Sequence, residues 1–314
     1  MNGQEIKQRV VSEIRKAVIG KDDIVEKSLA AIFAGGHILL EDIPGVGKTT
    51  LALAISKTLS LDYNRMQFTP DVMPSDVLGY SIYNKDENKF KYKKGVIMCN
   101  LFLADEINRT SSKTQSALLE AMEEGKVTIE GMTKELPDPF IVIATQNPVG
   151  SAGTTLLPDS QLDRFMVRLS MGYPDARDEI SILKSKFGGN NQIETINKVL
   201  DEGQINIIRK IVSEIYVHDA IYEYVVELVN RTRSTDLFDV GISPRGTVAL
   251  INMAKSKAYL EGRNYVIPED VQAMFLPVGT HRVQLSSKAK ISKMSAMTIL
   301  NGIMESVKIL SGQR

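Results

Sequence analysis

Short apolar runs bounded by turn residues recur through the first half of the chain. They span residues 36–41, 101–104 and 140–144. Continuous apolar runs of this length are typical of strands that are buried on both faces of a parallel sheet. Stretches with helical periodicity lie between them, for example residues 112–124. This alternation predicts an α/β domain with a central, doubly wound parallel sheet.

After Tyr173 and Pro174 the pattern becomes almost entirely helical. Helical periodicity covers residues 205–215, 220–231, 244–261 and 268–275, and the last two segments begin with a proline, which is favoured in the first turn of a helix. We therefore predict two domains, an α/β core over residues 1–172 and a smaller, all-α domain over residues 173–314.

Composition narrows the function classes. The 314 residues carry 38 Lys and Arg against 38 Asp and Glu, so the net charge of zero gives no sign of a nucleic acid or membrane partner. From His281 to Arg314, however, six basic residues face only Glu305, which fits either a solvated helix face or a docking surface. The single cysteine, Cys99, excludes an intrachain disulfide and is expected to be buried.

The longest uncharged stretch, residues 139–158, is interrupted by Asn, Gln, Pro and Gly and cannot span a bilayer as a helix. The first fifteen residues are polar, unlike a secretory signal. We expect a cytoplasmic protein without membrane insertion.

A glycine-rich turn follows the first predicted strand and opens a helix. Its glycines would let backbone N–H groups approach phosphate oxygens, Lys48 would reach the β- and γ-phosphates, and the Thr49 hydroxyl would bind Mg²⁺. The usual G-x-x-x-x-G-K-[ST] pattern has a glycine where this chain has Asp42, and a Gly-Lys-Thr turn is common, so the loop alone leaves ATP binding open. The candidate nucleotide-binding residues are Pro44, Gly45, Val46, Gly47, Lys48, Thr49 and Thr50.

A second motif favours an ATPase. The apolar run at residues 101–104 ends in Asp105 and Glu106, about 55 residues after the loop. In phosphate-loop ATPases the first such carboxylate holds Mg²⁺, and the second is placed to polarise the attacking water. Two isolated acids would be ordinary solvent-facing charge, but their position after a buried strand and a phosphate loop favours the catalytic interpretation.

With these motifs the chain resembles the MoxR family of AAA+ ATPases, which implies a P-loop core followed by a helical lid. The resemblance covers nearly the whole chain in order, and Asp42 fits it, because MoxR proteins often lack the first glycine. The segments that carry it are residues 40–49, 67–71, 74–76, 103–109, 113–122, 144–148, 157–165 and 243–245.

The resemblance implies further site residues. Asn147 corresponds to the first sensor of the γ-phosphate, Arg164 to an arginine finger that reaches the ATP of a neighbouring subunit, and Arg245 to a second sensor that contacts phosphate in the same chain. Without the family, these residues would fit an Asn-Pro turn, a surface salt bridge and a solvated helix start. The segment that packs against adenine in related proteins corresponds to Val18, Ile19 and Gly20, for which a hydrophobic contact with the core is the alternative.

Two projections could carry mechanical output. Residues 69–94 resemble an insertion of MoxR-related ATPases, with a charged hairpin tip at residues 85–89, and residues 125–136 alternate as in a β-hairpin. In this clade such projections line the pore or upper face of a ring; the alternative is that both are exposed loops. Residues 94–98 depart from the family, which often has Gly-Pro and aromatic residues there.

The resemblance implies ATP and Mg²⁺ as cofactors and a ring, commonly a hexamer, in which neighbouring subunits complete each other's active sites. It also implies chaperone-like remodelling or activation of protein partners, typically proteins with von Willebrand factor A domains. The alternative is a nucleic-acid-translocating motor. Zero net charge and the lack of tryptophan argue against that motor, whereas the basic C-terminal stretch leaves it open.

Overall fold

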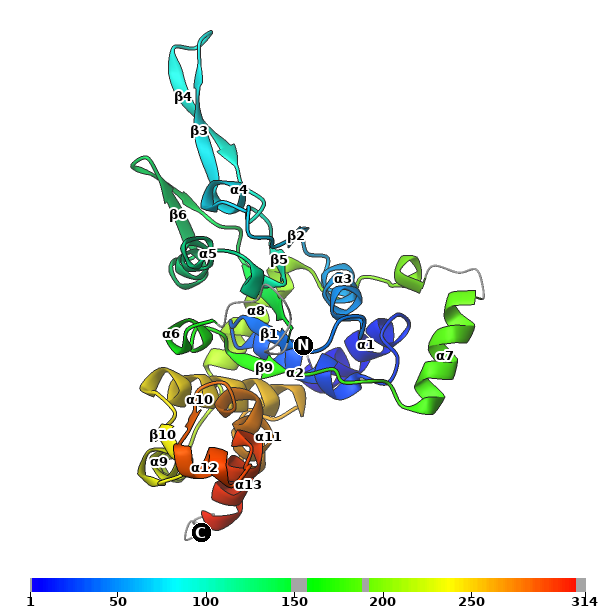
Figure 1. The fold of residues 1–314 in the computed structure, drawn as a ribbon. Helices are drawn as coiled ribbons and strands as arrows, with labels where there is room; N and C mark the ends of the chain where they lie inside the picture. Colours follow the sequence, from blue (N-terminus) through cyan, green and yellow to red (C-terminus); the bar gives the residue numbers. More distant parts are fainter. Residues whose placement is uncertain (1, 148–156, 188–191, 309–314) are drawn as a thin grey trace.

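A computed structural model of the chain describes residues 2–147, 157–187 and 192–308. Its centre is a five-stranded sheet of order β2-β5-β8-β1-β9 in which each neighbouring pair is parallel (Figure 1). The predicted parallel sheet is confirmed, and the three apolar runs form three of its strands. The strands are β1 (Ile38–Glu41), β2 (Tyr63–Gln67), β5 (Leu101–Asp105), β8 (Ile141–Gln146) and β9 (Val167–Leu169).

Both faces of the sheet are buried, which explains the continuous apolar runs. Alternate residues point to opposite faces, so Leu40 and Leu103 belong to one core cluster, whereas Leu39 and Phe102 belong to another. The first cluster is covered by helices α1 (Gly3–Arg15), α2 (Asp22–Phe33) and α3 (Lys48–Thr58), and the second by α5 (Ser112–Glu124).

The second half is mainly helical, as predicted, with boundaries shifted by a few residues. A two-stranded antiparallel ribbon, β10 (Phe238–Val240) with β11 (Gln284–Leu285), is an addition to the expected helices. The helices are α7 (Ala176–Phe187), α8 (Glu202–Ser213), α9 (Asp219–Ser234), α10 (Pro244–Leu260), α11 (Pro268–Gly279), α12 (Ser287–Ile291) and α13 (Ala296–Ser306). Three short helices of the described chain lie outside these elements, namely α6 (Asp159–Leu162), η1 (Ile107–Arg109) and η2 (Gln192–Thr195).

One continuous hydrophobic cluster joins the two halves. It includes Val10 of α1 and Leu250 and Tyr259 of α10. The helical half therefore packs directly on the N-terminal helices, and the proposed division between residues 172 and 173 stays a prediction. Helix α7 differs from this pattern, because none of its residues is buried and it stands apart from the body (Figure 1).

Both predicted hairpins are confirmed. Strands β3 (Gly79–Asn84) and β4 (Lys89–Lys94) pair antiparallel after the short helix α4 (Pro74–Leu78), and β6 (Lys126–Ile129) pairs with β7 (Met132–Glu135). They project from the same end of the molecule (Figure 1). Where the chain departs from the family, Gly95 lies so close to Val77 that an added Cβ would be 2.2 Å from its carbonyl oxygen.

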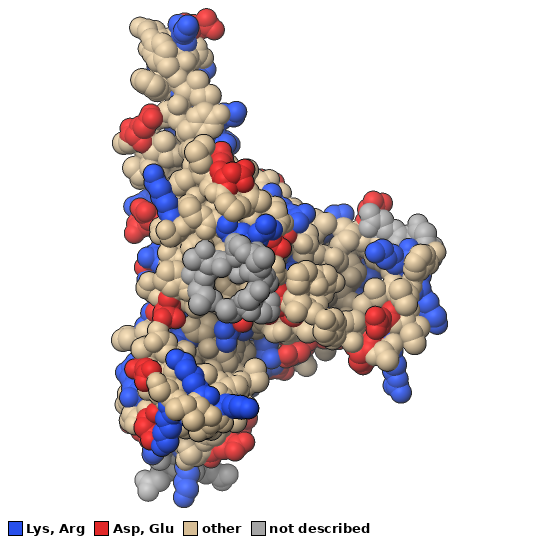
Figure 2. All heavy atoms as spheres, viewed as in Figure 1, with Lys and Arg blue, Asp and Glu red and all other residues tan. Residues whose placement is uncertain are grey.

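Among the described residues, the face drawn in Figure 2 has no large area of a single charge, in line with the net charge of zero. Basic and acidic side chains are interspersed over the hairpins, the α7 lobe and the lower helical part in the face drawn in Figure 2. The basic C-terminal stretch is divided, since Arg282 is buried, four lysines between residues 288 and 308 are exposed, and Arg314 lies outside the described residues. Among the described helices, none combines the length and the apolar character needed to cross a bilayer.

Cys99 is buried, as predicted. Burial raises the pKa of its thiol to about 12, so the reactive thiolate is scarce at neutral pH.

Candidate active site at the carboxyl edge of the sheet

The carboxyl ends of β1, β5 and β8 meet at a cavity of about 370 Å³. In an open parallel sheet, ligands bind beyond these strand ends, because loops from neighbouring strands converge there. The cavity brings together the phosphate-loop residues, the paired acids and Asn147. Its lining residues are Pro44, Gly45, Gly47, Lys48, Thr49, Thr50, Arg65, Gln67, Asp105, Glu106 and Asn147.

The loop after β1 has the conformation that its glycines permit. Gly45 and Gly47 have φ of 88° and 98°, which side chains with a Cβ rarely adopt, and α3 begins at Lys48. The Lys48 ammonium lies 2.5 Å from the carbonyl oxygen of Asp42 and 3.3 Å from Oδ1 of Asn147. Burial lowers the pKa of this ammonium, and the charges of Asp42, Asp105 and Glu106 oppose the shift. A helix N-terminus and a lysine at one cavity wall form an anion site.

Asp42, which replaces the expected glycine, has a structural role. Its carboxylate accepts hydrogen bonds from the Gly172 N–H at 2.7 Å and the Ser170 hydroxyl at 2.9 Å, and from the Ile43 N–H. Burial raises the pKa of this carboxyl, but these hydrogen bonds outweigh burial and lower it. The carboxylate therefore ties the phosphate loop to the segment after β9.

The paired acids are held by different neighbours. Asp105 accepts a hydrogen bond from the Thr145 hydroxyl at 2.6 Å on Oδ1 and from Arg65 at 2.7 Å on Oδ2. Glu106, at a φ of 56°, accepts from Asn147 Nδ2 at 3.1 Å and from Arg109 Nη1 at 2.7 Å. Asn147 therefore contacts both Lys48 and Glu106, and its role as a sensor of the γ-phosphate stays a prediction.

The oxygen donors fit a magnesium ion. Thr49 and Asp105 line the same cavity and supply one hydroxyl and one carboxylate. Mg²⁺ takes one or two such protein ligands when phosphate oxygens and waters complete its shell.

Two residues around the acids were not singled out from the sequence as functional, namely Arg65 and Thr145. The sequence placed Arg109 near the active-site face without a role, and the structure pairs it with Glu106. Arg65 lies on the edge strand β2, whose exposed and half-buried residues gave no apolar run. Its place two residues before the Gln67 that begins a family segment was the available signal.

The proposed adenine segment lies outside this cavity. Val18 is buried in the core, and Gly20 has a φ of 72° and packs against Asp178 of α7, where an added Cβ would be 1.7 Å from Oδ2. None of Val18, Ile19 and Gly20 lines the cavity, so their contact with adenine stays a prediction.

Arg164 and Arg245 lie together at a different place. Both form ion pairs with Glu123 of α5, and Arg164 Nη1 also donates to the Leu119 carbonyl at 3.0 Å. They line a separate cavity of about 190 Å³ with His37, and neither lines the phosphate cavity. Arg245 therefore does not line the phosphate cavity of its own chain, and its role as a second sensor stays a prediction.

A buried cluster fixes the two arginine-bearing segments to each other. Asp163 accepts from Arg282 Nε at 2.7 Å and from the Ser243 hydroxyl at 2.9 Å. Arg282 also donates to the carbonyl oxygens of Phe165 and Val278, both at 2.6 Å. Asp163, which directly precedes Arg164, is thus hydrogen-bonded to Ser243. Ser243 is the N-cap of α10 and lies two residues before Arg245.

Known proteins similar to this chain show its family. Residues 37–167 match the ATPase family associated with various cellular activities (AAA), and residues 230–303 match the AAA lid domain. The chain is 36% identical over 311 residues to the chaperone MoxR1 of Mycobacterium tuberculosis, covering 96% of this chain and 82% of that protein. The chain belongs to the MoxR family of AAA+ ATPases. It is therefore an enzyme that hydrolyses ATP.

Two further proteins are similar to this chain over most of their length. The uncharacterized protein YeaC of Bacillus subtilis is 48% identical over 301 residues, which are 96% of this chain and 94% of that one. The crystal structure of a proposed ATPase from Cytophaga hutchinsonii has a TM-score of 0.88 at 34% identity, covering 99% of this chain and 97% of the other. The predicted fold, an α/β core with a helical lid region, is confirmed.

Proposed function

We propose that this MoxR-family ATPase is a chaperone-like machine that assembles into a ring and uses ATP to remodel or activate a partner protein. The observation that carries the proposal is the separation of the active-site parts. Lys48, Asp105 and Glu106 share one cavity, whereas Arg164 and Arg245 line another. A second copy of the chain would bring the two arginines to the phosphates.

The chain's own residues account for the chemistry at the phosphates. Lys48 and the N–H groups at the start of α3 bind the β- and γ-phosphates, and Thr49 and Asp105 hold Mg²⁺, which when bound neutralises charge on the phosphate oxygens. Glu106 takes the proton of the attacking water, oriented by Asn147 and Arg109, which each hold one carboxylate oxygen.

The two arginines would stabilise charge on the transferred phosphoryl group from the neighbouring copy. We propose that Arg245 acts together with Arg164 at that neighbouring site, because both pair with the same carboxylate of Glu123. Loss of the γ-phosphate would then release contacts made by both copies, so hydrolysis changes the interface between subunits.

The client would engage the two hairpins. The β3–β4 hairpin exposes Ile82, Tyr83 and Phe90 far from the body, where they can contact an unfolded or loosely packed segment (Figure 1). One relative is named a chaperone. By family resemblance, a protein with a von Willebrand factor A domain is the expected client, and a hexamer is the expected ring.

Glu106→Gln should bind ATP with nearly unchanged affinity but hydrolyse it at least about 100-fold more slowly, because the amide cannot accept the proton. Nucleotide binding by fluorescence and phosphate release measure the two effects. Hydrolysis at the wild-type rate would show that Glu106 is not the base. The same variant with ATP should retain the client, so proteins that co-purify with it identify the partner.

Mixing two inactive variants tests the shared site. Lys48→Ala cannot bind ATP productively, and Arg164→Ala lacks the proposed finger, so each alone should be nearly inactive. Mixed assemblies contain interfaces with an intact Lys48 on one side and an intact Arg164 on the other, and hydrolysis should return to a measurable fraction of wild type. The same mixture with Arg245→Ala should also recover activity. Absence of recovery in both mixtures would contradict a site completed by a second copy.

The nucleic-acid motor makes a distinct prediction. Tight DNA binding that weakens steeply with salt, together with stimulated ATP hydrolysis, would favour it. We expect neither in a filter-binding experiment at low salt.

A further inference from the structure

Helix α7 carries an apolar stripe that no other described residue of the chain covers. Ile180, Leu183 and Phe187 are 52%, 50% and 83% exposed. Their spacing of three and four residues puts them on one face of the helix. A helix of 12 residues is marginal in water unless a face of it packs against a partner. The exposed stripe is therefore a candidate contact surface.

The start of α7 is tied to the phosphate-loop side of the molecule. Gly172 donates its N–H to Asp42 of the loop at 2.7 Å, and Lys21 Nζ donates to the carbonyl oxygen of Tyr173 at 2.9 Å. Asp178, in the first turn of α7, packs against Gly20. A neighbour that reaches the phosphate cavity therefore also comes close to α7.

An apolar groove lies beside Arg245. It has a volume of about 320 Å³ between α9 and the start of α10, and Val226, Val229, Pro244 and Val248 are among its lining residues. Val226 and Val248 are 48% and 61% exposed. Because Pro244 and Val248 flank Arg245 on the same helix, any contact that delivers Arg245 to a nucleotide brings the groove there too.

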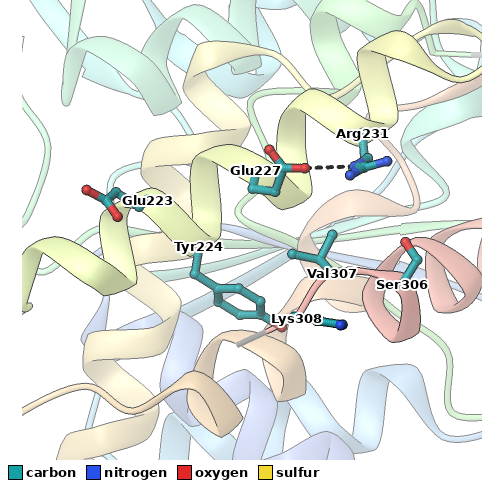
Figure 3. A pocket seen from close by; sticks show the side chains of 7 residues that line it. All are labelled: Glu223, Tyr224, Glu227, Arg231, Ser306, Val307 and Lys308. Atoms are coloured by element: carbon teal, nitrogen blue, oxygen red, sulfur yellow. Dashed lines mark hydrogen bonds and ion pairs between the residues drawn. The ribbon is translucent and has the colours of Figure 1, made fainter. Parts of the chain in front are cut away.

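A second hollow on the other flank of α9 has a different character. It has a volume of about 540 Å³, and its seven lining residues include four charged ones (Figure 3). They are Glu223, Tyr224, Glu227, Arg231, Ser306, Val307 and Lys308. Glu227 and Arg231 form an ion pair across one helical turn. This charged rim does not match an apolar helix stripe, whereas the valine-lined groove does.

We propose that α7 of one copy packs into the α9–α10 groove of the neighbouring copy. This rests on the proposed function, in which Arg245 reaches the neighbour's nucleotide. In Figure 1, α7 and the α9–α10 region lie on opposite sides of the chain, as a head-to-tail contact between identical copies requires. Phe187, the most exposed of the three stripe residues, is the anchor, and Val226 and Val248 receive the stripe.

The contact links assembly to the nucleotide. Because α7 begins beside Gly20 and the phosphate loop, packing by the neighbour's lid fixes the segment proposed to hold adenine. The groove and the two arginines then close one nucleotide site from the same side.

Engineered cysteines test the contact directly. Cys99 is buried, so an added surface cysteine is the reactive one. In the Glu106→Gln background with ATP, a mixture of Leu183→Cys and Val248→Cys proteins should form an intermolecular disulfide under mild oxidation, and most of the product should be the mixed pair. Glu223→Cys, on the other flank of α9, is the matched control and should give at least about tenfold less product with Leu183→Cys.

A second measurement does not depend on a disulfide. Leu183→Ser with Phe187→Ser changes only exposed side chains, so the variant should fold and bind ATP as the wild type does. Its concentration for half-maximal assembly, measured by mass photometry, should rise at least tenfold. Equal disulfide yield with Val248→Cys and Glu223→Cys, or unchanged assembly of the double variant, would overturn the proposal. A different outcome is recovery of activity in the Lys48→Ala and Arg245→Ala mixture while Leu183→Cys and Val248→Cys form no disulfide with each other. That result would reject this contact but not the active site shared between two copies.

Discussion

At the scale of single residues, the carboxylate of Asp105 is shared between a cation of the protein and a proposed metal ion. Arg65 donates to Oδ2 from both Nη2 and Nε, at 2.7 and 3.2 Å, while Thr145 occupies Oδ1. Gln67 Oε1 lies 3.3 Å from Arg65 Nη2 and offers a second acceptor. The guanidinium can therefore leave Asp105 without losing every partner.

Arg65→Ala should strengthen divalent-ion binding to the ADP-loaded protein, because it removes a positive charge that competes for Asp105. Arg65 is half exposed, so solvent screens the effect to about threefold to tenfold in Kd. Titration with Mn²⁺ measures it. Two control variants should bind Mn²⁺ with an affinity closer to that of the wild type. Arg65→Lys keeps the positive charge beside Asp105, and Arg109→Ala removes a partner of Glu106 instead. Weaker Mn²⁺ binding by Arg65→Ala would show that Arg65 supports the metal site.

The sequence predicted the positions of those site residues that come after the ends of strands. The loop glycines, Lys48, Asp105 and Asn147 all lie in the segments that follow an apolar run, and parallel strands bring their carboxyl ends to one edge. The position of Arg245 could not be predicted in this way. It depends on the ion pair of Arg245 with Glu123 of α5, two residues more than a hundred positions apart, which local patterns do not encode.

At the scale of elements, one buried arginine attaches the helical region to the segment that carries Arg164. The Arg282 side chain is only 2% exposed and donates to Asp163 and to several carbonyl oxygens. Burial lowers the pKa of this guanidinium, and Asp163 opposes the shift. Local periodicity predicted helix α11, which precedes Arg282, but not this junction, because Arg282 was interpreted only as part of a basic stretch.

Arg282→Ala should lower the free energy of unfolding by about 3–5 kcal/mol, because it leaves Asp163 and buried carbonyl oxygens without their donor. Urea unfolding followed by circular dichroism measures this in a chain without tryptophan. Arg164→Ala is the matched control, since its partly exposed ion pair should contribute only about 1 kcal/mol or less. Similar losses in both variants would contradict a special role for the buried junction.

Short elements escaped prediction for a related reason. Strand β9 has only three residues, and β2 at the sheet edge has no fully buried position, so neither gives an apolar run. The long helices were predicted because their apolar stripes face one continuous core. The sequence pattern therefore predicted the helices and strands that pack broadly against the core. It missed β2 and β9, the two edge strands of the sheet.

At the scale of the whole molecule, a half-buried histidine, His37, connects the start of β1 to β8 and α5. The His37 Nδ1 accepts from the Val142 N–H of β8 at 3.0 Å, and Nε2 lies 3.1 Å from the Met122 carbonyl oxygen of α5. This arrangement requires a neutral ring with its proton on Nε2. Burial lowers the pKa of His37 to about 4; the Met122 hydrogen bond opposes the shift, and the charge of Arg209 adds to it.

This shift predicts how stability depends on pH. An unfolded histidine takes up a proton near pH 6.5, whereas His37 in the folded chain stays neutral until about pH 4. Between these values the unfolded state binds more protons, so stability is complete above pH 6.5 and falls as the pH drops. The loss is about 1.4 kcal/mol per pH unit for one such group, or about 2 kcal/mol between pH 6.5 and pH 5. His281, whose pKa burial also lowers, should add a loss of the same sign.

His37→Asn separates this contribution from the rest of the acid response. The amide oxygen can still accept from Val142, but the side chain no longer titrates, so the variant should be less stable at pH 7 and lose less stability between pH 6.5 and pH 5. Urea midpoints across this range, compared with the wild type, measure the difference in slope. An unchanged slope would mean that His37 is protonated in the folded chain, which is incompatible with a backbone N–H donating to its Nδ1.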